Sequence, residues 1–178
     1  MPISDIHAIP AIVNEVYRLQ PERMIELGIG FGKYGVLCRE VLDAIYGRCR
    51  PDQWERTIHG VEGFDQYRNP CWDAYDAVEV RDFSTAAGRP SGWDLVLMVD
   101  SLEHLEPAAG GELLEYLVSN NRSVIVSVPR GPMPQGATFG NEFECHRTTF
   151  SGSEFAQYGA TVLHTGICCA VSIRGNPR

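Results

Sequence analysis

A glycine-rich stretch near the start of the chain combines residue types that suit cofactor binding. An apolar run over residues 23–28 leads into Glu26-Leu-Gly28-Ile-Gly30-Phe-Gly32-Lys-Tyr-Gly35. Glycines in a turn between a strand and a helix let the backbone approach a ligand without clashes from Cβ atoms. The helix that follows begins with unpaired N–H groups. Because glycine weakens helices and strands, this many glycines favour a ligand-binding turn over a tight turn that holds nothing.

The spacing of these glycines fits two classes of cofactor. Gly30, Gly32 and Gly35 satisfy the G-x-G-x-x-G spacing of dinucleotide-binding turns. Enzymes that bind S-adenosylmethionine favour an acidic residue two positions before a G-x-G-x-G run. Glu26 stands in that position before Gly28. The motif alone therefore leaves a nicotinamide dinucleotide and S-adenosylmethionine both open.

A carboxylate follows the second apolar run, in Val61-Glu62-Gly63-Phe64-Asp65. An acid at the end of the second strand of such folds accepts hydrogen bonds from ribose hydroxyls, which suits either cofactor. A dehydrogenase also needs a second lobe that brings its substrate to the nicotinamide. About 50 residues follow the fifth expected strand, which is small for such a lobe. The context therefore favours S-adenosylmethionine.

These motifs follow apolar runs that alternate with helical patterns. We expect helices at residues 5–19, 33–46, 113–118 and 151–158, a short helix or turn at 70–75, and strands at 23–28, 57–61, 77–83, 93–99 and 123–128, with an antiparallel strand pair over 161–174. Alternating strands and helices predict right-handed crossovers and an α/β fold with a doubly wound, mostly parallel sheet. Ligands of such sheets bind beyond the carboxyl ends of the strands, where the motifs lie.

From about residue 20 to residue 170 the chain resembles the class I, seven-stranded methyltransferases that use S-adenosylmethionine, especially a group of small bacterial methyltransferase-domain proteins. The segments that carry the resemblance are 24–35, 59–65, 93–104, 124–129 and 140–146. The glycine motif is shared with other nucleotide binders. The pattern Asp-x-x-Glu-His after the fourth strand, at Asp100, Glu103 and His104, is much more specific. The resemblance implies a Rossmann-like, three-layer α/β/α fold with a seven-stranded sheet and an antiparallel C-terminal hairpin.

The resemblance also implies roles for single residues. Those expected at the cofactor are Glu26, Gly28, Gly30, Gly32, Glu62, Phe64, Asp82, Phe83 and Asp100. The glycines would wrap the methionine and ribose, Glu26 would hold the loop or the amino group, and Asp100 would face the sulfonium. Glu62 would bind the ribose in preference to Asp65, because it ends the apolar run. The other three residues would meet the adenine, although Asp82 is also a candidate for a simple turn cap.

The acceptor side needs alignment, exclusion of water and, for an oxygen or nitrogen acceptor, a group that takes a proton. Histidine suits this role because it titrates near neutrality. His104, next to Glu103, and His146 are the candidates for this catalytic base, and Glu144 could orient either histidine. The competing interpretations are that Glu103 and His104 cap a helix or face solvent and that His146 is an ordinary loop histidine. Metal binding by His104, Glu103 and His146 is an alternative, but the spacing of these residues matches no common ligand pattern, so we expect no metal site.

The remaining histidines, His7, His59 and His164, look structural, the first in a helix and the others in strands. The formal net charge of −8, from 15 Lys and Arg against 23 Asp and Glu, disfavours nucleic acid as a partner. The six cysteines form no C-x-x-C pair, so we expect reduced thiols. Since neither a signal peptide nor a membrane-spanning run is evident, we expect a cytoplasmic protein that does not enter membranes.

A chain of 178 residues suits one domain. We expect an N-terminal helix over residues 1–20, a cofactor-binding core over 21–130, and a loop or lid with the C-terminal hairpin over 131–178. The predicted function is in-line methyl transfer from S-adenosylmethionine to a small-molecule or sugar-like acceptor. The alternatives are a binding module without catalysis and, less favoured, an NAD-dependent oxidoreductase. The acceptor and the oligomeric state are left open, with a homodimer as one option.

Overall fold

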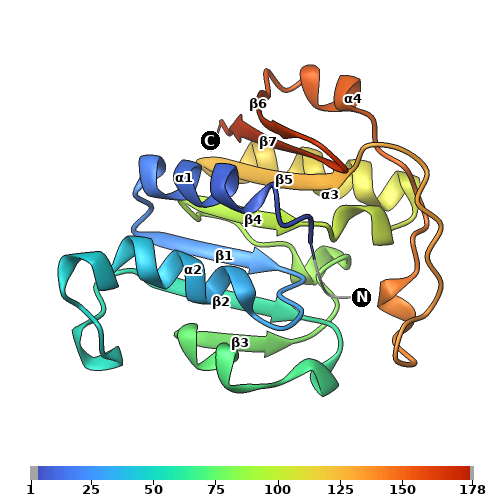
Figure 1. Ribbon diagram of the computed structural model, residues 1–178. Coiled ribbons are helices and arrows are strands. Elements are labelled where there is room, and N and C mark those ends of the chain that lie inside the picture. Colours follow the sequence, from blue (N-terminus) through green and yellow to red (C-terminus); the bar gives the residue numbers. More distant parts are fainter. Residues whose placement is uncertain (1–3, 177–178) are drawn as a thin grey trace.

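Each apolar run of the sequence forms a strand, and the strands join in one seven-stranded sheet in the computed structural model, which describes residues 4–176 (Figure 1). The strands are β1 (Arg23–Leu27), β2 (Thr57–Glu62), β3 (Ala77–Val80), β4 (Leu95–Val99), β5 (Ser123–Pro129), β6 (Thr161–Thr165) and β7 (Cys168–Arg174). Their order in the sheet is β3-β2-β1-β4-β5-β7-β6. Between β1 and β4 the direction of winding reverses, and the carboxyl ends of these strands form the usual ligand site of a doubly wound sheet.

The pairing of the strands confirms the expected mixed sheet. The first five strands are parallel to one another, β7 runs antiparallel to β5, and β6 runs antiparallel to β7. The central strand β4 is buried over its whole length, because layers of side chains cover both faces of the sheet. The C-terminal pair forms the hairpin that the sequence predicts around Gly166.

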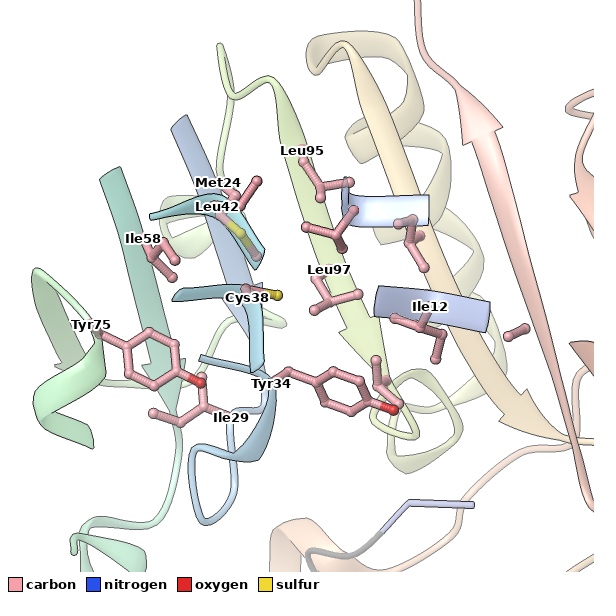
Figure 2. Close-up of a cluster of buried hydrophobic side chains, with 14 of the residues drawn as sticks. Ile12, Met24, Ile29, Tyr34, Cys38, Leu42, Ile58, Tyr75, Leu95 and Leu97 are labelled. Atoms are coloured by element: carbon pink, nitrogen blue, oxygen red, sulfur yellow. The ribbon is translucent and has the colours of Figure 1, made fainter. Parts of the chain in front are cut away.

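Helices lie on both faces of the sheet and form the three expected layers (Figure 1). The helices α1 (Ile9–Leu19) and α2 (Lys33–Leu42) cover one face, and α3 (Pro107–Asn120) and the short α4 (Gly152–Ala156) cover the other. Figure 2 shows the core beneath α1 and α2, where Ile12, Cys38 and Leu42 point toward side chains of the central strands. The connections from β2 to β3 and from β3 to β4 contain only 3-10 turns, the longest at Pro70–Ala74.

The N-terminal helix is shorter than its apolar pattern predicts. Residues 5–8 form a turn closed by the Ala8 N–H, which donates to the Asp5 carbonyl at 3.1 Å, and α1 begins only at Ile9. The placement of His7 in a helix was therefore wrong. Pro10 occupies the first turn of α1, where a missing N–H costs nothing.

Other boundaries also differ from the prediction, three of them clearly. Residues 28–32 form the glycine loop. The helix that follows it ends at Leu42, and a separate 3-10 turn spans Ala44–Tyr46. The third strand ends at Val80, so that Asp82 and Phe83 lie in the following loop. The helix expected over 113–118 extends over Pro107–Asn120, because Pro107 and the small residues after it form its first turns.

Within residues 4–176, no helix combines the length and the apolar character needed to cross a membrane. All six cysteines lie in this part of the chain, and none of them forms a disulfide there. Three of them, Cys38, Cys168 and Cys169, are buried and pack as small apolar side chains.

Candidate functional site

A pocket lies beyond the carboxyl ends of β1, β2 and β4, where the winding of the sheet reverses. Of the residues expected at a site, it is lined by Glu26, Gly28, Gly30, Glu62, Asp82, Phe83, Asp100 and His104. The sequence motifs are far apart in the chain, and the parallel sheet brings them to one edge. The pocket also contains residues to which we assigned no role at the site, among them Ser4, Lys33, Tyr34, Asn141 and Phe143.

The glycine loop is attached to the neighbouring strand by its backbone. The N–H groups of Gly28 and Ile29 donate to the carbonyl of Val61, at 2.9 and 3.3 Å. Gly28 has a φ of +77°, and a Cβ atom added there would lie 2.8 Å from the Cβ of Ser101. Only glycine combines this backbone conformation with this close approach, so the loop needs glycine at this position.

Glu62 connects the end of β2 to the glycine loop. Its Oε2 accepts a hydrogen bond from the Gly30 N–H at 2.8 Å, and its Oε1 accepts one from the Phe64 N–H at 3.0 Å. The residue is 5% exposed, and burial raises the pKa of its carboxyl. A carboxylate has about four lone-pair sites, so each oxygen keeps capacity for a donor from a ligand in the pocket.

Glu26, at the end of β1, is fixed from behind by Tyr75. The Tyr75 hydroxyl donates to Glu26 Oε2 at 2.7 Å and accepts the Gly35 N–H at 3.0 Å. Glu26 is only 2% exposed, and burial raises the pKa of its carboxyl to about 8. A cation in the pocket would favour the ionised form of this carboxyl.

The same tyrosine explains why position 35 needs a glycine. A Cβ atom added to Gly35 would lie 2.2 Å from Cζ of the Tyr75 ring, which packs directly on α2. Figure 2 shows this ring among the buried side chains beneath the helix. The third glycine of the dinucleotide spacing therefore has a packing role and is not evidence for a dinucleotide.

Lys33 and Asp100 add opposite charges to the pocket. The Lys33 ammonium donates to Ser4 Oγ, and its half-buried position lowers the pKa of Lys33. Asp100 has the left-handed φ of +49° directly after β4, and its Oδ1 accepts a hydrogen bond from the Ser127 hydroxyl at 2.7 Å. Burial raises the pKa of the Asp100 carboxyl. Lys33 stands inside the glycine motif, yet the motif alone does not indicate that it faces the ligand.

The two residues expected after the third strand both line the pocket. Asp82 Oδ1 accepts a hydrogen bond from the Ser84 N–H at 2.7 Å. This oxygen therefore caps a turn, as the competing interpretation of Asp82 proposed. The Phe83 ring lies near Gly28, 3.7 Å from the position of a Cβ atom added there, and forms an apolar wall.

Two of the residues expected at the cofactor do not line the pocket. The Phe64 ring packs against the Tyr67 ring, with their centroids 5.0 Å apart. A Cβ atom added to Gly32 would lie 3.0 Å from Cδ1 of the Trp72 indole, so Gly32 packs against this ring. These residues shape the site indirectly.

The long loop after β5 lies beside the pocket and contributes Asn141, Phe143 and Glu144 to its wall. The Phe143 ring lies 3.0 Å from the position that a Cβ on Gly63 would occupy, which explains the glycine after Glu62. Glu144 is buried and accepts a hydrogen bond from the Tyr67 hydroxyl at 2.9 Å. The sequence pattern of this loop did not reveal which of its side chains turn inward.

Glu103, His104 and His146 come together at one end of the site. The centroids of the two imidazole rings lie 4.8 Å apart, and His146 Nε2 lies 4.0 Å from Glu103 Oε1. His104 lines the pocket, whereas Glu103 and His146 do not. Glu103 is 1% exposed, so the interpretation that it caps a helix or faces solvent was wrong. Burial, with repulsion from Asp100, raises the pKa of the Glu103 carboxyl well above its usual range.

Backbone carbonyls hold both imidazoles in place. Nδ1 of His104 lies 3.3 Å from the Cys145 carbonyl oxygen, and Nδ1 of His146 contacts the Met133 carbonyl oxygen. A carbonyl accepts only, so each Nδ1 donates to its carbonyl, and the His104 ring also has a hydrogen bond to the backbone carbonyl of Asp100. Burial lowers the pKa of His104, which favours the neutral ring. The His104 ring can therefore accept a proton or bind a cation.

No family model matches the sequence, and no curated protein matches it. Many solved structures share its fold. The N-terminal domain of EvdMO1, crystallised with SAH (S-adenosylhomocysteine) and D-fucose, matches 98% of this chain and 85% of its own, with a TM-score of 0.60 and 15% identity. The magnesium protoporphyrin IX methyltransferase ChlM from Synechocystis PCC 6803, with bound SAH, matches 95% of this chain and 83% of its own, with a TM-score of 0.63 and 13% identity.

A third neighbour is larger than this chain. An O-methyltransferase family protein from Burkholderia thailandensis has a TM-score of 0.63 and 11% identity, and the match covers 97% of this chain but only 57% of that protein. At these identities the likeness shows the fold alone. The chain has the Rossmann-like class I methyltransferase fold, with the strand order given above.

Proposed function

We propose that the protein is a methyltransferase that uses S-adenosylmethionine and acts on a small molecule. The observation that carries the proposal is the direct hydrogen bond of 2.8 Å between the glycine loop and Glu62 at the point where the sheet reverses its winding. It brings together a backbone that permits close approach and a carboxylate suited to ribose hydroxyls. The D-fucose present with one structural neighbour makes sugar-like hydroxyl compounds the first acceptors to test.

The charges of the pocket fit the amino-acid end of this cofactor. Lys33 would pair with the carboxylate of the methionine, and Glu26 and Asp100 would attract its ammonium and sulfonium groups. The Phe83 ring, which also lines the pocket, offers an apolar surface for the adenine. The donor set therefore fits a zwitterionic nucleoside with an additional positive charge.

When bound, S-adenosylmethionine supplies a methyl group that its sulfonium already activates. The residues of the chain have to align the acceptor, exclude water and take a proton from it. His104 suits the last task, because its side chain lines the pocket and its lowered pKa favours the neutral ring, which keeps one nitrogen lone pair. Glu103 and His146, which lie next to His104, would set the electrostatics around its ring.

Calorimetric titration of the protein with S-adenosylmethionine, SAH and NAD tests the cofactor. We expect one molecule of S-adenosylmethionine or SAH to bind per chain and NAD to bind far more weakly, since the packing of Tyr75 accounts for Gly35. Saturable binding of NAD alone would contradict the proposal. Transfer of a labelled methyl group to a panel of sugars and small hydroxyl compounds then distinguishes an enzyme from a module that binds without turnover.

The affinity for S-adenosylmethionine should depend on pH through Glu26. The pKa of this carboxyl is about 8 in the free protein, so it is mostly protonated at neutral pH. The cationic cofactor prefers the ionised form and lowers that pKa, so binding releases a proton below pH 8. We expect the affinity to rise about tenfold between pH 6.5 and pH 8 and to level off above that.

Calorimetry in buffers with different ionisation enthalpies measures both the affinity and the released proton. The matched variant is Glu26→Gln, which can keep the hydrogen bond from Tyr75 but cannot ionise. It should bind more weakly and lose most of the dependence on pH. An equally steep dependence in this variant would assign the titration to another group.

A further inference from the structure

Glu103 is a buried carboxyl without a hydrogen-bonding partner. Its side chain is 2% exposed, and neither Oε1 nor Oε2 has a partner among the described residues. A buried carboxylate without compensation is costly, and native proteins pair such a group with a cation or keep it protonated. The surroundings of Glu103 therefore have to contain what balances it.

Two imidazole nitrogens face the same space. Each imidazole contacts a backbone carbonyl through Nδ1, one ring nitrogen of each histidine lies within 4.8 Å of a Glu103 oxygen, and Nε2 of His146 lies 4.0 Å from Glu103 Oε1. A histidine that binds a metal commonly donates its other N–H to a carbonyl or a carboxylate, which fixes the tautomer and the orientation of the ring. Both His104 and His146 have this arrangement.

The three side chains are close enough to share one ion. One ligand atom from each of Glu103, His104 and His146 lies within 4.8 Å of the other two. Bonds of about 2.1 Å to a metal would hold neighbouring ligand atoms about 3.0–3.4 Å apart. Side-chain rotations and a small shift of the loop that contains His146 would close the difference.

We propose that Glu103, His104 and His146 form a binding site for a divalent transition-metal ion such as Zn²⁺, Mn²⁺ or Co²⁺. Two imidazoles and one carboxylate are the donors that these ions share in protein sites, whereas Mg²⁺ prefers oxygen ligands. This proposal departs from the expectation of no metal site. That expectation rested on spacing along the sequence, and the fold brings His146 to its neighbours across a long loop.

The position of the site suggests its use. His104 lines the pocket, so an ion bound to it would lie at the pocket wall with positions left for an oxygen of a second molecule. A bound metal lowers the pKa of an oxygen ligand such as a hydroxyl. In the metal-bound protein this effect would replace proton acceptance by His104, whose Nε2 would then be a ligand. The site itself does not depend on the proposed cofactor.

Titration with Co²⁺ tests the proposal in the absence of any cofactor or acceptor. After treatment with a chelator, the protein should bind one Co²⁺ per chain and show visible absorption bands of the ion. Glu103→Gln and His146→Ala should each weaken Co²⁺ binding by at least about 10- to 100-fold. Replacing a residue that only hydrogen-bonds to a metal ligand already lowers metal affinity by this much. Mg²⁺ should compete poorly, and Co²⁺ or Zn²⁺ should raise the melting temperature of the original protein but not that of these two variants.

His7→Ala is the matched control, since it removes an exposed histidine outside the cluster, and it should bind Co²⁺ like the original protein. Glu103→Gln keeps the shape of the side chain, so its melting curve without metal shows whether the fold is intact. Absence of saturable binding by Co²⁺, Zn²⁺ and Mn²⁺ would overturn the proposal. So would Co²⁺ binding that both variants retain, or bands that report thiolate ligands. Glu103 would then be a protonated carboxyl.

Discussion

Replacing Glu62 with Ala is expected to weaken the binding of SAH by at least about 100-fold. The variant loses the carboxylate that would accept both ribose hydroxyls, and a hydrogen bond to a charged group contributes about 1.5–3 kcal/mol. It also leaves the N–H groups of Gly30 and Phe64 without their acceptor. Both effects act at the glycine loop, so affinity should fall more than the loss of one contact predicts.

Calorimetric titration with SAH measures this loss. Asp65→Asn is the matched control, because Asp65 is the competing acid of the same segment and pairs on the surface with Arg68 at 3.1 Å. It should change the dissociation constant by less than about threefold, in line with the small contribution of exposed ion pairs. If Asp65→Asn impaired binding and Glu62→Ala did not, the ribose site would have been assigned to the wrong carboxylate.

Gly35→Ala is expected to lower the free energy of unfolding by about 2–3 kcal/mol, although alanine is the better helix former. The new Cβ atom would lie 2.2 Å from Cζ of the Tyr75 ring, inside the buried contact between α2 and that ring. Relief of the clash has to move Tyr75, whose hydroxyl holds Glu26. The variant should therefore also bind SAH more weakly than the original protein.

Gly111→Ala provides the comparison, because Gly111 lies in α3 and an added Cβ atom would meet nothing within 4 Å. This variant should gain up to about 1 kcal/mol from helix propensity alone. For a chain of this size, thermal unfolding should show a melting temperature about 5–10 °C lower for Gly35→Ala and slightly higher for Gly111→Ala. Equal shifts in both variants would mean that the packing of Tyr75 on Gly35 is unimportant.

The fold and the cofactor end of the pocket could largely be predicted from the sequence. Buried parallel strands are continuous apolar runs, so β1, β4 and β5 stand out without any knowledge of their neighbours. Residues that directly follow such strands must gather at one edge of the sheet. Glu62 was found in this way, whereas Glu26 was found from the glycine motif and the role of Asp100 was implied by the resemblance to class I methyltransferases.

Side chains that reach the site through tertiary packing could not be found in the same way. Tyr75 lies in a segment without regular secondary structure, and only the fold brings its hydroxyl to Glu26. The association of His146 with Glu103 depends on the path of the loop after β5, whose proline and glycine residues carry no periodic signal. The early end of β3 was missed because an apolar pattern does not reveal where strand pairing stops.

The crystal structure of the protein with SAH bound would test the central claim most directly. The account predicts that both ribose hydroxyls lie within hydrogen-bonding distance of the Glu62 carboxylate and that the glycine loop from Gly28 to Gly32 contacts the nucleoside. The carboxylate of the homocysteine should lie beside Lys33. SAH bound at another surface, or a pocket that stays without ligand at saturating SAH, would contradict the account.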